Sequence, residues 1–219
     1  MVLSYADLNY IAQTITTAYN PNPLAAIDIE DLLKKQCGVS VQYHVLTQYG
    51  SALGVCANHA TLVKVWDHSW PTLIEMETDT VFVEKRLLFP KLRGMRNFTV
   101  AHEGAHKILF DMDNAQTRKV NYRYRDKKNP KDKWGEWQAD TLGSCLLMPE
   151  RNVRAIFYGF FGKERIDALN IGVREIGDAF TAMADYMGVS RQALSLRLTK
   201  LSLTDRIINE NPLNIYVED

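Results

Sequence analysis

The segment Thr99-Val-Ala-His102-Glu103-Gly104-Ala105-His106 combines helical spacing with the chemistry of metal ligands. Its two histidines are four positions apart, and side chains at i and i+4 lie on the same face of a helix. Both imidazoles can therefore reach one ion, whereas Glu103 lies one step round the helix and can address a water on that ion. Zinc suits such a site because it accepts imidazole and carboxylate ligands and keeps one position open. The spacing predicts a helix over 99–110 that carries Zn²⁺.

A second motif, Glu136-Trp-Gln-Ala-Asp140, begins thirty residues beyond His106 in a segment with helical character over 135–148. Glu136 and Asp140 share one helix face, so Glu136 can be the third metal ligand. Asp140 can then accept a hydrogen bond from the free ring nitrogen of a ligand histidine and strengthen that ligand. The alternative is an exposed acidic pair on a surface helix. Four apolar residues argue against it, because they indicate a largely buried helix: Ala139, Leu142, Leu146 and Leu147.

These motifs resemble those of the ImmA/IrrE family of metallopeptidases. The resemblance rests on Phe98-Thr-Val-Ala-His-Glu-Gly-Ala-His106 and on Glu136-Trp-Gln-Ala-Asp-Thr-Leu-Gly-Ser-Cys-Leu-Leu-Met-Pro149. It covers residues 93–149 closely, residues 173–203 moderately, and the chain before residue 90 only in its architecture. This family more often has leucine where Gly104 stands and glycine where Ala105 stands, and neither difference touches a ligand.

The resemblance implies a zinc metallopeptidase of gluzincin-like architecture with the same site that the spacing predicts. His102, His106 and Glu136 would be the metal ligands, Glu103 the catalytic base, and Asp140 the support of a ligand histidine. It also implies a regulatory substrate. Members of this family relieve repression by cleaving, or promoting the cleavage of, a helix-turn-helix repressor that is often encoded beside them on mobile elements or in stress operons.

Apolar periodicity predicts the α+β class, with a mostly helical zincin-like core and a small three-stranded sheet. Helices are expected over 5–19, before Asn20-Pro-Asn-Pro23, and over 29–37, before Gly38. The three expected strands cover 39–45, 62–66 and 80–84, and after Pro90 the chain is mostly helical.

Residues 118–133 contain eight Lys or Arg against two Asp and show no clear period. They are interpreted as a solvated loop, or as a lid beside the site. A peptidase also needs a donor for the oxyanion of the tetrahedral intermediate, in addition to its metal. Tyr122, Tyr124 and Arg125 in this segment are the candidates, and the sequence does not choose among them.

The chain is expected to divide into a metallopeptidase domain over 1–170 and a helix-turn-helix-like segment over 171–219, packed on or beside it. In that segment Arg191, Gln192, Ser195 and Arg197 could face a DNA groove. Direct DNA binding by a transcriptional regulator is therefore an alternative function. A second alternative is a zinc protein that sequesters a partner without cleaving it.

The bulk composition limits the function classes. Lys plus Arg and Asp plus Glu both total 26, which gives a formal net charge of zero. This balance argues against a protein that coats nucleic acid or a membrane surface by charge alone. The chain has no secretory leader pattern, no stretch of roughly eighteen apolar residues, and three cysteines without a CxxC pair. A cytoplasmic location is therefore expected.

Overall fold

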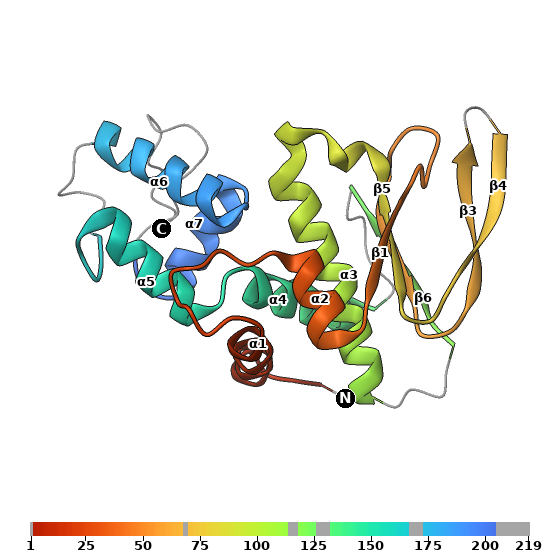
Figure 1. Cartoon of the computed structure of the whole chain (residues 1–219), viewed down its shortest axis with the longest axis horizontal. Helices are drawn as coiled ribbons and strands as arrows, with labels where there is room; N and C mark the ends of the chain where they lie inside the picture. Colours follow the sequence, from red (N-terminus) through yellow and green to blue (C-terminus); the bar gives the residue numbers. More distant parts are fainter. Residues whose placement is uncertain (1, 68–69, 114–117, 126–131, 167–172, 205–219) are drawn as a thin grey trace.

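The computed structural model describes residues 2–67, 70–113, 118–125, 132–166 and 173–204. Within them the chain is an α+β protein, as predicted. Its helices lie on one side of the sheet (Figure 1). From right to left in Figure 1, the elements follow one another as a β-hairpin, a sheet, two layers of helices and a last group of helices. The first layer holds α2 (Ile29–Cys37) and α3 (Arg93–Asp113), and the second holds α1 (Tyr5–Tyr19) and α4 (Lys133–Leu147).

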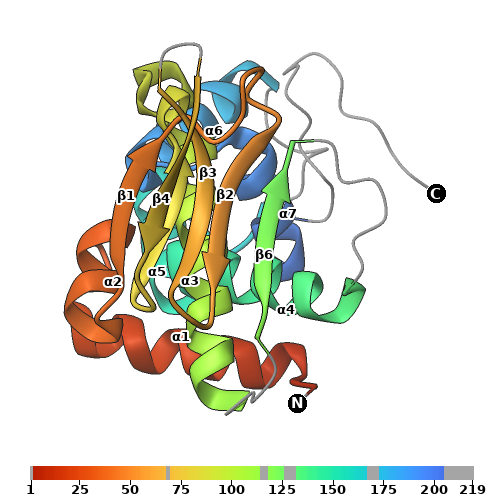
Figure 2. The same ribbon diagram turned by 90° about the vertical axis from the view of Figure 1, so that its right-hand side faces the viewer.

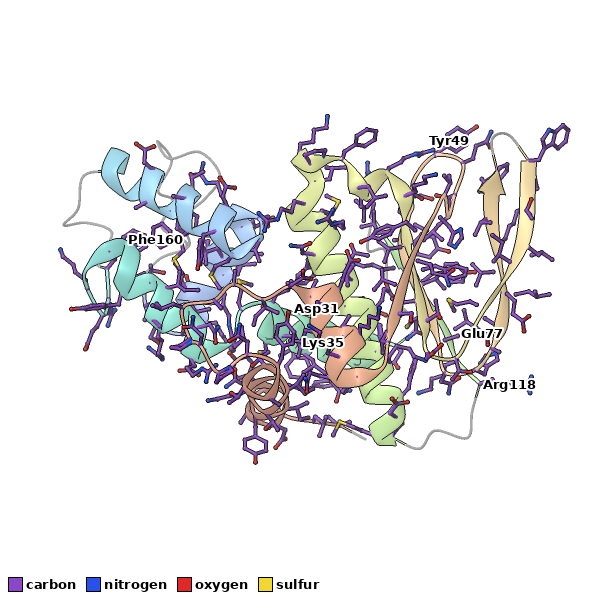
Figure 3. The ribbon with its side chains drawn as sticks, viewed as in Figure 1. Asp31, Lys35, Tyr49, Glu77, Arg118 and Phe160 are labelled. Carbon is purple, nitrogen blue, oxygen red and sulfur yellow. The ribbon has the colours of Figure 1, made fainter. Side chains whose placement is uncertain are left out.

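The first two helices begin and end at the residues that the sequence indicates. α1 (Tyr5–Tyr19) begins with a capping box in which Ser4 and Asp7 satisfy each other's backbone N–H groups. α2 (Ile29–Cys37) is capped by Asp28 and ends at Gly38, whose φ of 65° lies in the left-handed region that glycine adopts without strain. The outer face of α2 carries the exposed ion pair of Asp31 and Lys35 (2.8 Å; Figure 3).

The strands form two sheets rather than one. The four-stranded sheet has the order β1-β5-β2-β6, in which β1 and β5 are parallel and the other pairs antiparallel. A separate antiparallel hairpin joins β3 and β4 and packs its inner face on this sheet. The bounds are β1 (Ser40–His44), β2 (Ala52–Ala57), β3 (Thr61–Asp67), β4 (Trp70–Met76), β5 (Thr80–Glu84) and β6 (Val120–Tyr124).

The predicted number of strands in the sheet was wrong, because the sequence analysis missed β2 and β6. All six residues of β2 are buried, so this central strand lacks the alternation that reveals a half-exposed one. β6 lies within the basic segment 118–133, which was interpreted as a loop. The expected strand over 62–66 exists, but it is part of the hairpin and not of the main sheet.

α3 (Arg93–Asp113) is longer than the helix predicted over 99–110 and follows two short 3-10 turns, Lys85–Leu88 and Pro90–Leu92. It packs against the sheet on the face opposite the hairpin (Figure 2). The glycine at position 104, unusual for the resembled family, has a local explanation. A Cβ there would lie 2.5 Å from a methyl group of Leu33, so α2 occupies the space that a side chain would need.

The C-terminal helices join the same hydrophobic core as the N-terminal ones. These helices are α4 (Lys133–Leu147), α5 (Glu150–Phe161), α6 (Val173–Met187) and α7 (Arg191–Lys200). One cluster of buried side chains connects α1 to α7 and includes Leu8, Leu32, Val100, Leu146, Phe180 and Leu198. The division of the chain near residue 170 into two domains remains a prediction. Helices on both sides of that position contribute side chains to this one cluster.

α7 shows where the predicted DNA-facing residues lie. Ser195 and Arg197 are buried, so neither can contact a DNA groove in this arrangement. The Arg197 guanidinium donates hydrogen bonds to the Met148 carbonyl, the Tyr5 hydroxyl and Asn9 Oδ1. Packing and hydrogen bonding inside the fold, rather than DNA recognition, account for these two positions.

Among the described residues, no helix combines the length and the apolar character that crossing a bilayer requires.

Candidate metal centre

The site forms where α4 approaches the middle of α3. Gly143 permits this approach, because a Cβ there would lie 3.1 Å from the backbone carbonyl of Ala101 and from the amide nitrogen of His102. The two helices are thus close enough for His102 and His106 of α3 to contact Glu136 and Asp140 of α4.

The structure brings together the three side chains that the sequence predicts as metal ligands. Nε2 of His106 lies 3.1 Å from Glu136 Oε1, and Nε2 of His102 lies 3.5 Å from Glu136 Oε2. One ligand atom from each of the three residues falls within 4.8 Å of the others. Within the described part of the chain, this is the one group of at least three His, Cys, Asp or Glu residues that could hold a metal ion.

Glu136 and His102 affect each other's protonation. Hydrogen bonds from the two histidines lower the pKa of the Glu136 carboxyl well below its usual range, although burial opposes the shift. Burial by itself would lower the pKa of His102, but its hydrogen bonds to Asp140 and Glu136 outweigh this and raise it. The site is therefore built around an ionised carboxylate that faces two imidazoles.

Glu103 lies on the sheet side of the same helix and is completely buried. Neither of its carboxylate oxygens has a nitrogen or oxygen hydrogen-bond partner among the described residues, and the buried Cys56 thiol lies beside them. Burial raises its pKa, opposed by the nearby His102, His106 and Arg123. β2 leaves room for it only because residue 54 is glycine, since a Cβ on Gly54 would lie 2.5 Å from Glu103 Oε1.

An unpartnered buried carboxylate destabilises a fold unless a cation or a donor offsets it. Two imidazole nitrogens and one carboxylate are also a ligand set that zinc accepts while keeping a position for water. The residues present therefore fit a catalytic zinc ion.

Asp140 lies beside His102, one of the two histidines that the sequence predicts as metal ligands. Its Oδ1 is 2.9 Å from Nδ1 of His102 and accepts a hydrogen bond from Nη1 of Arg123 at 3.0 Å. The Arg123 guanidinium also lies over the ring of Phe98, 4.9 Å from its centroid. A hydrogen-bonded chain thus runs from β6 through Asp140 to His102.

Sequence reasoning missed the two β6 residues that face the site, Asn121 and Arg123. Asn121 Nδ2 lies 3.3 Å from Nδ1 of His106. Arg123 is directly opposite Gly54 in the β2–β6 register, and directly opposite residues of an antiparallel pair share a face. The alternation of Val120, Tyr122 and Tyr124 with the polar Asn121 and Arg123 is the sequence signal that could have identified the strand.

The same alternation decides between the predicted oxyanion donors. Tyr122 is opposite Val55, which belongs to the cluster between the sheet and the hairpin. Tyr122 and Tyr124 therefore project from the face away from Glu103, where their rings stack with centroids 6.1 Å apart. Arg125 is exposed beyond the end of β6. The two tyrosines thus point away from Glu103, and Arg123 is the cationic side chain of β6 on the same face of the sheet as Glu103.

A cavity of about 890 Å³ adjoins the site on the side of Asp140 and Arg123. Its walls come from the beginning of α3, from α4 and from α7, and they include the exposed apolar side chains of Met95, Trp137 and Leu196. Lys200 and Gln192 line it from α7. We refer to this cavity as the α3–α4–α7 groove.

Comparison with known proteins identifies the family. The sequence model of Peptidase_M78, described as the IrrE N-terminal-like domain, matches residues 84–199, just over half of the chain. The chain belongs to the Peptidase_M78 family. The ImmA/IrrE resemblance inferred from the motifs is thereby confirmed, and the Peptidase_M78 match includes all of the residues that converge on the site from α3, β6 and α4.

Beyond the Peptidase_M78 match, the chain is similar to a solved structure, a Mycobacterium tuberculosis transcriptional regulator, with 16% sequence identity and a TM-score of 0.44. The similarity covers 89% of this chain and 46% of that one, so this chain spans slightly less than half of the regulator's length. No curated protein sequence matches the chain significantly.

Proposed function

We propose that this chain is a zinc-dependent endopeptidase in which His102, His106 and Glu136 hold the metal and Glu103 is the catalytic base. The observation that carries the proposal is the convergence of two Nε2 atoms and one carboxylate beside a buried carboxylate without partners. Membership of a family of metallopeptidases supports the same activity.

A zinc ion in this site would supply Lewis acidity, which polarises the scissile carbonyl and makes water a nucleophile near neutral pH. Glu103 takes one proton from the attacking water and delivers it to the leaving amine. Asp140 keeps the proton on Nδ1 of His102 and so directs Nε2 towards the metal.

Arg123 is the side chain that we assign to the developing negative charge, in place of the tyrosines. It lies on the site face of β6, and its Nε is buried without a hydrogen-bond partner among the described residues. A preorganised cationic donor of this kind stabilises charge that appears only in the transition state.

The substrate is proposed to be a polypeptide that lies along β6 and the α3–α4–α7 groove. β6 is at the end of the strand order, beside α4 in Figure 2, so one side of its backbone can pair with an extended peptide. The exposed apolar side chains of the groove offer a surface for substrate side chains next to the site. The family resemblance suggests a helix-turn-helix repressor as this polypeptide.

The test compares the wild-type chain with Glu103→Gln and His106→Ala. Each purified protein is analysed for bound zinc and incubated with the helix-turn-helix repressor encoded nearest to its gene. We expect Glu103→Gln to retain zinc but lose cleavage, because the ligands remain and the proton acceptor does not. His106→Ala should lose both. Cleavage at the wild-type rate by Glu103→Gln would show that the base is misassigned.

The same materials separate the rival functions. A gel shift on promoter DNA at moderate salt, with and without a chelator, tests direct DNA binding, which the burial of Ser195 and Arg197 disfavours. A protein that only sequesters its partner would bind the repressor with unchanged affinity in Glu103→Gln and would produce no fragments in either form.

A further inference from the structure

The two histidines of the proposed metal site differ in what holds their outer ring nitrogen. Nδ1 of His102 faces the Asp140 carboxylate at 2.9 Å. An ionised carboxylate only accepts hydrogen bonds, so Nδ1 of His102 carries a proton, and Nε2 is the nitrogen that loses its proton when a metal binds. Nδ1 of His106 faces the Asn121 side chain instead, with Nδ2 at 3.3 Å. An amide group can donate through nitrogen or accept through oxygen, so this partner does not by itself determine the tautomer of His106.

Two arrangements satisfy the contact between Asn121 and His106. In the first, Nδ2 of Asn121 donates to Nδ1, and Nε2 of His106 carries the proton and donates to Glu136 Oε1 at 3.1 Å. In the second, the amide is turned by half a rotation, its Oδ1 accepts from Nδ1–H, and the lone pair of Nε2 is free. Only the second arrangement can bind a metal through Nε2, because a ligand nitrogen must be deprotonated.

The surroundings hold the imidazole ring but leave room for the amide. The His106 ring is buried, stacks on Phe110 with centroids 5.9 Å apart, and meets the edge of the His102 ring at 4.7 Å. Asn121 is only half-buried. His106 and Asn121 both line a cavity of about 190 Å³ whose walls do not include Asp140. The amide is therefore the part that can adapt.

We propose that Asn121 is a positioning residue for the metal centre, whose side-chain amide turns to select the Nδ1–H tautomer of His106 and so completes the ligand set. The inference rests on the metal site of the proposed function. In this proposal the two histidines differ. The Asp140 carboxylate fixes the proton of His102 on Nδ1, whereas the Nδ1–H tautomer of His106 depends on the side-chain oxygen of Asn121.

The test uses the full chain with three substitutions and zinc alone as the probe. Asn121→Leu keeps the shape but removes the hydrogen bond, whereas Asn121→Asp offers an acceptor only, as Asp140 does to His102. Tyr122→Leu is the matched control, since it changes the next residue of β6 on the opposite face. Zinc affinity is measured by competition with a chromophoric chelator, and thermal unfolding of the chelator-treated proteins verifies that each is folded.

We expect Asn121→Leu to weaken zinc binding about 10- to 100-fold, which is typical for the loss of an outer partner of a metal ligand. Asn121→Asp should bind at least as tightly as the wild type, and Tyr122→Leu should match it. Affinity within twofold of the wild type in Asn121→Leu would overturn the proposal, as would an Asn121→Asp protein that binds as weakly as Asn121→Leu.

A spectroscopic measurement separates positioning from added charge. Long-range ¹H–¹⁵N correlation spectra report which nitrogen of His106 is protonated. In chelator-treated Asn121→Asp the proton should be on Nδ1 before any zinc is added, and a proton that stays on Nε2 would contradict the proposed role. A folded wild-type chain that binds no zinc would instead refute the proposed function, and the spectra of the zinc-free Asn121→Asp protein would still decide the role of Asn121.

Discussion

At the scale of single residues, the site depends on a carboxylate that the fold leaves without partners. Glu103 is fully buried, and both of its oxygens lack hydrogen-bond partners among the described residues. A buried polar group in this condition weakens the fold, and such groups concentrate where reactivity is needed. The sheet contributes by leaving space: Gly54 in β2 is the residue against which the Glu103 side chain packs.

Substitution of Gly54 by alanine tests this contact. The added Cβ would lie 2.5 Å from Glu103 Oε1, so the carboxylate must move, while His102, His106 and Glu136 belong to other elements. We expect the turnover number for repressor cleavage to fall about 100-fold, as a displacement of about 1 Å in a reacting group can cause. Zinc affinity should stay unchanged.

The control for this variant is Gly159→Ala, a helical glycine whose Cβ would have no neighbour within 4 Å. It should leave both turnover and zinc affinity at their wild-type values. A Gly54→Ala protein with wild-type turnover would mean that Glu103 has more freedom than the packing indicates.

At the scale of elements, one buried guanidinium adds hydrogen bonds to the apolar packing that holds α7. Arg197 donates to the Met148 carbonyl at the end of α4 and to Asn9 and Tyr5 of α1. Because its partners belong to the first helix and to the α4–α5 junction, the last helix is joined to elements far away in the sequence. This attachment also positions one wall of the α3–α4–α7 groove.

Replacement of Arg197 by methionine should therefore lower the free energy of unfolding by about 2–3 kcal/mol, the range for lost hydrogen bonds to a charged group. Chemical denaturation monitored by circular dichroism measures this change. Gln192→Ala, an exposed substitution on the same helix, should alter the stability by less than about 0.5 kcal/mol. Equal stabilities of the two variants would show that α7 is held by its apolar face alone.

At the scale of the whole molecule, the proposed zinc ion would connect α3 in the centre of the fold to α4. A ligand that binds only the folded state stabilises it by RT ln(1 + [L]/Kd), which is about 2.7 kcal/mol at a free concentration of 100 times Kd. The fold and the metal are therefore expected to be thermodynamically linked.

Zinc at such a concentration should raise the melting temperature of the chelator-treated chain by about 5–10 °C, since about 1 kcal/mol corresponds to 2–4 °C in a protein of this size. Magnesium, which prefers oxygen ligands, should have no effect at the same concentration. The His106→Ala variant should respond to neither ion. A melting temperature of the wild type that is insensitive to zinc would contradict binding at this site.

The proposed ligand residues could be selected from the sequence because the geometry within each helix is local. His102 and His106, like Glu136 and Asp140, each lie one helical turn apart, and a helix places such pairs on one face whatever surrounds it. The caps of α1 and α2 could be predicted for the same reason, as Ser4, Asp28 and Gly38 act on backbone groups within a few residues of themselves.

Only the tertiary structure decided which side chains complete the centre. Asn121 and Arg123 reach His106 and Asp140 because β6 pairs with β2, a strand more than sixty positions earlier, and this pairing leaves little trace in the segment 118–133. The space for Glu103 at Gly54 and the approach of the two helices at Gly143 are likewise properties of neighbours that are distant in the chain. Helical periodicity is encoded by adjacent residues, whereas strand register and close packing exist only once separate segments have met.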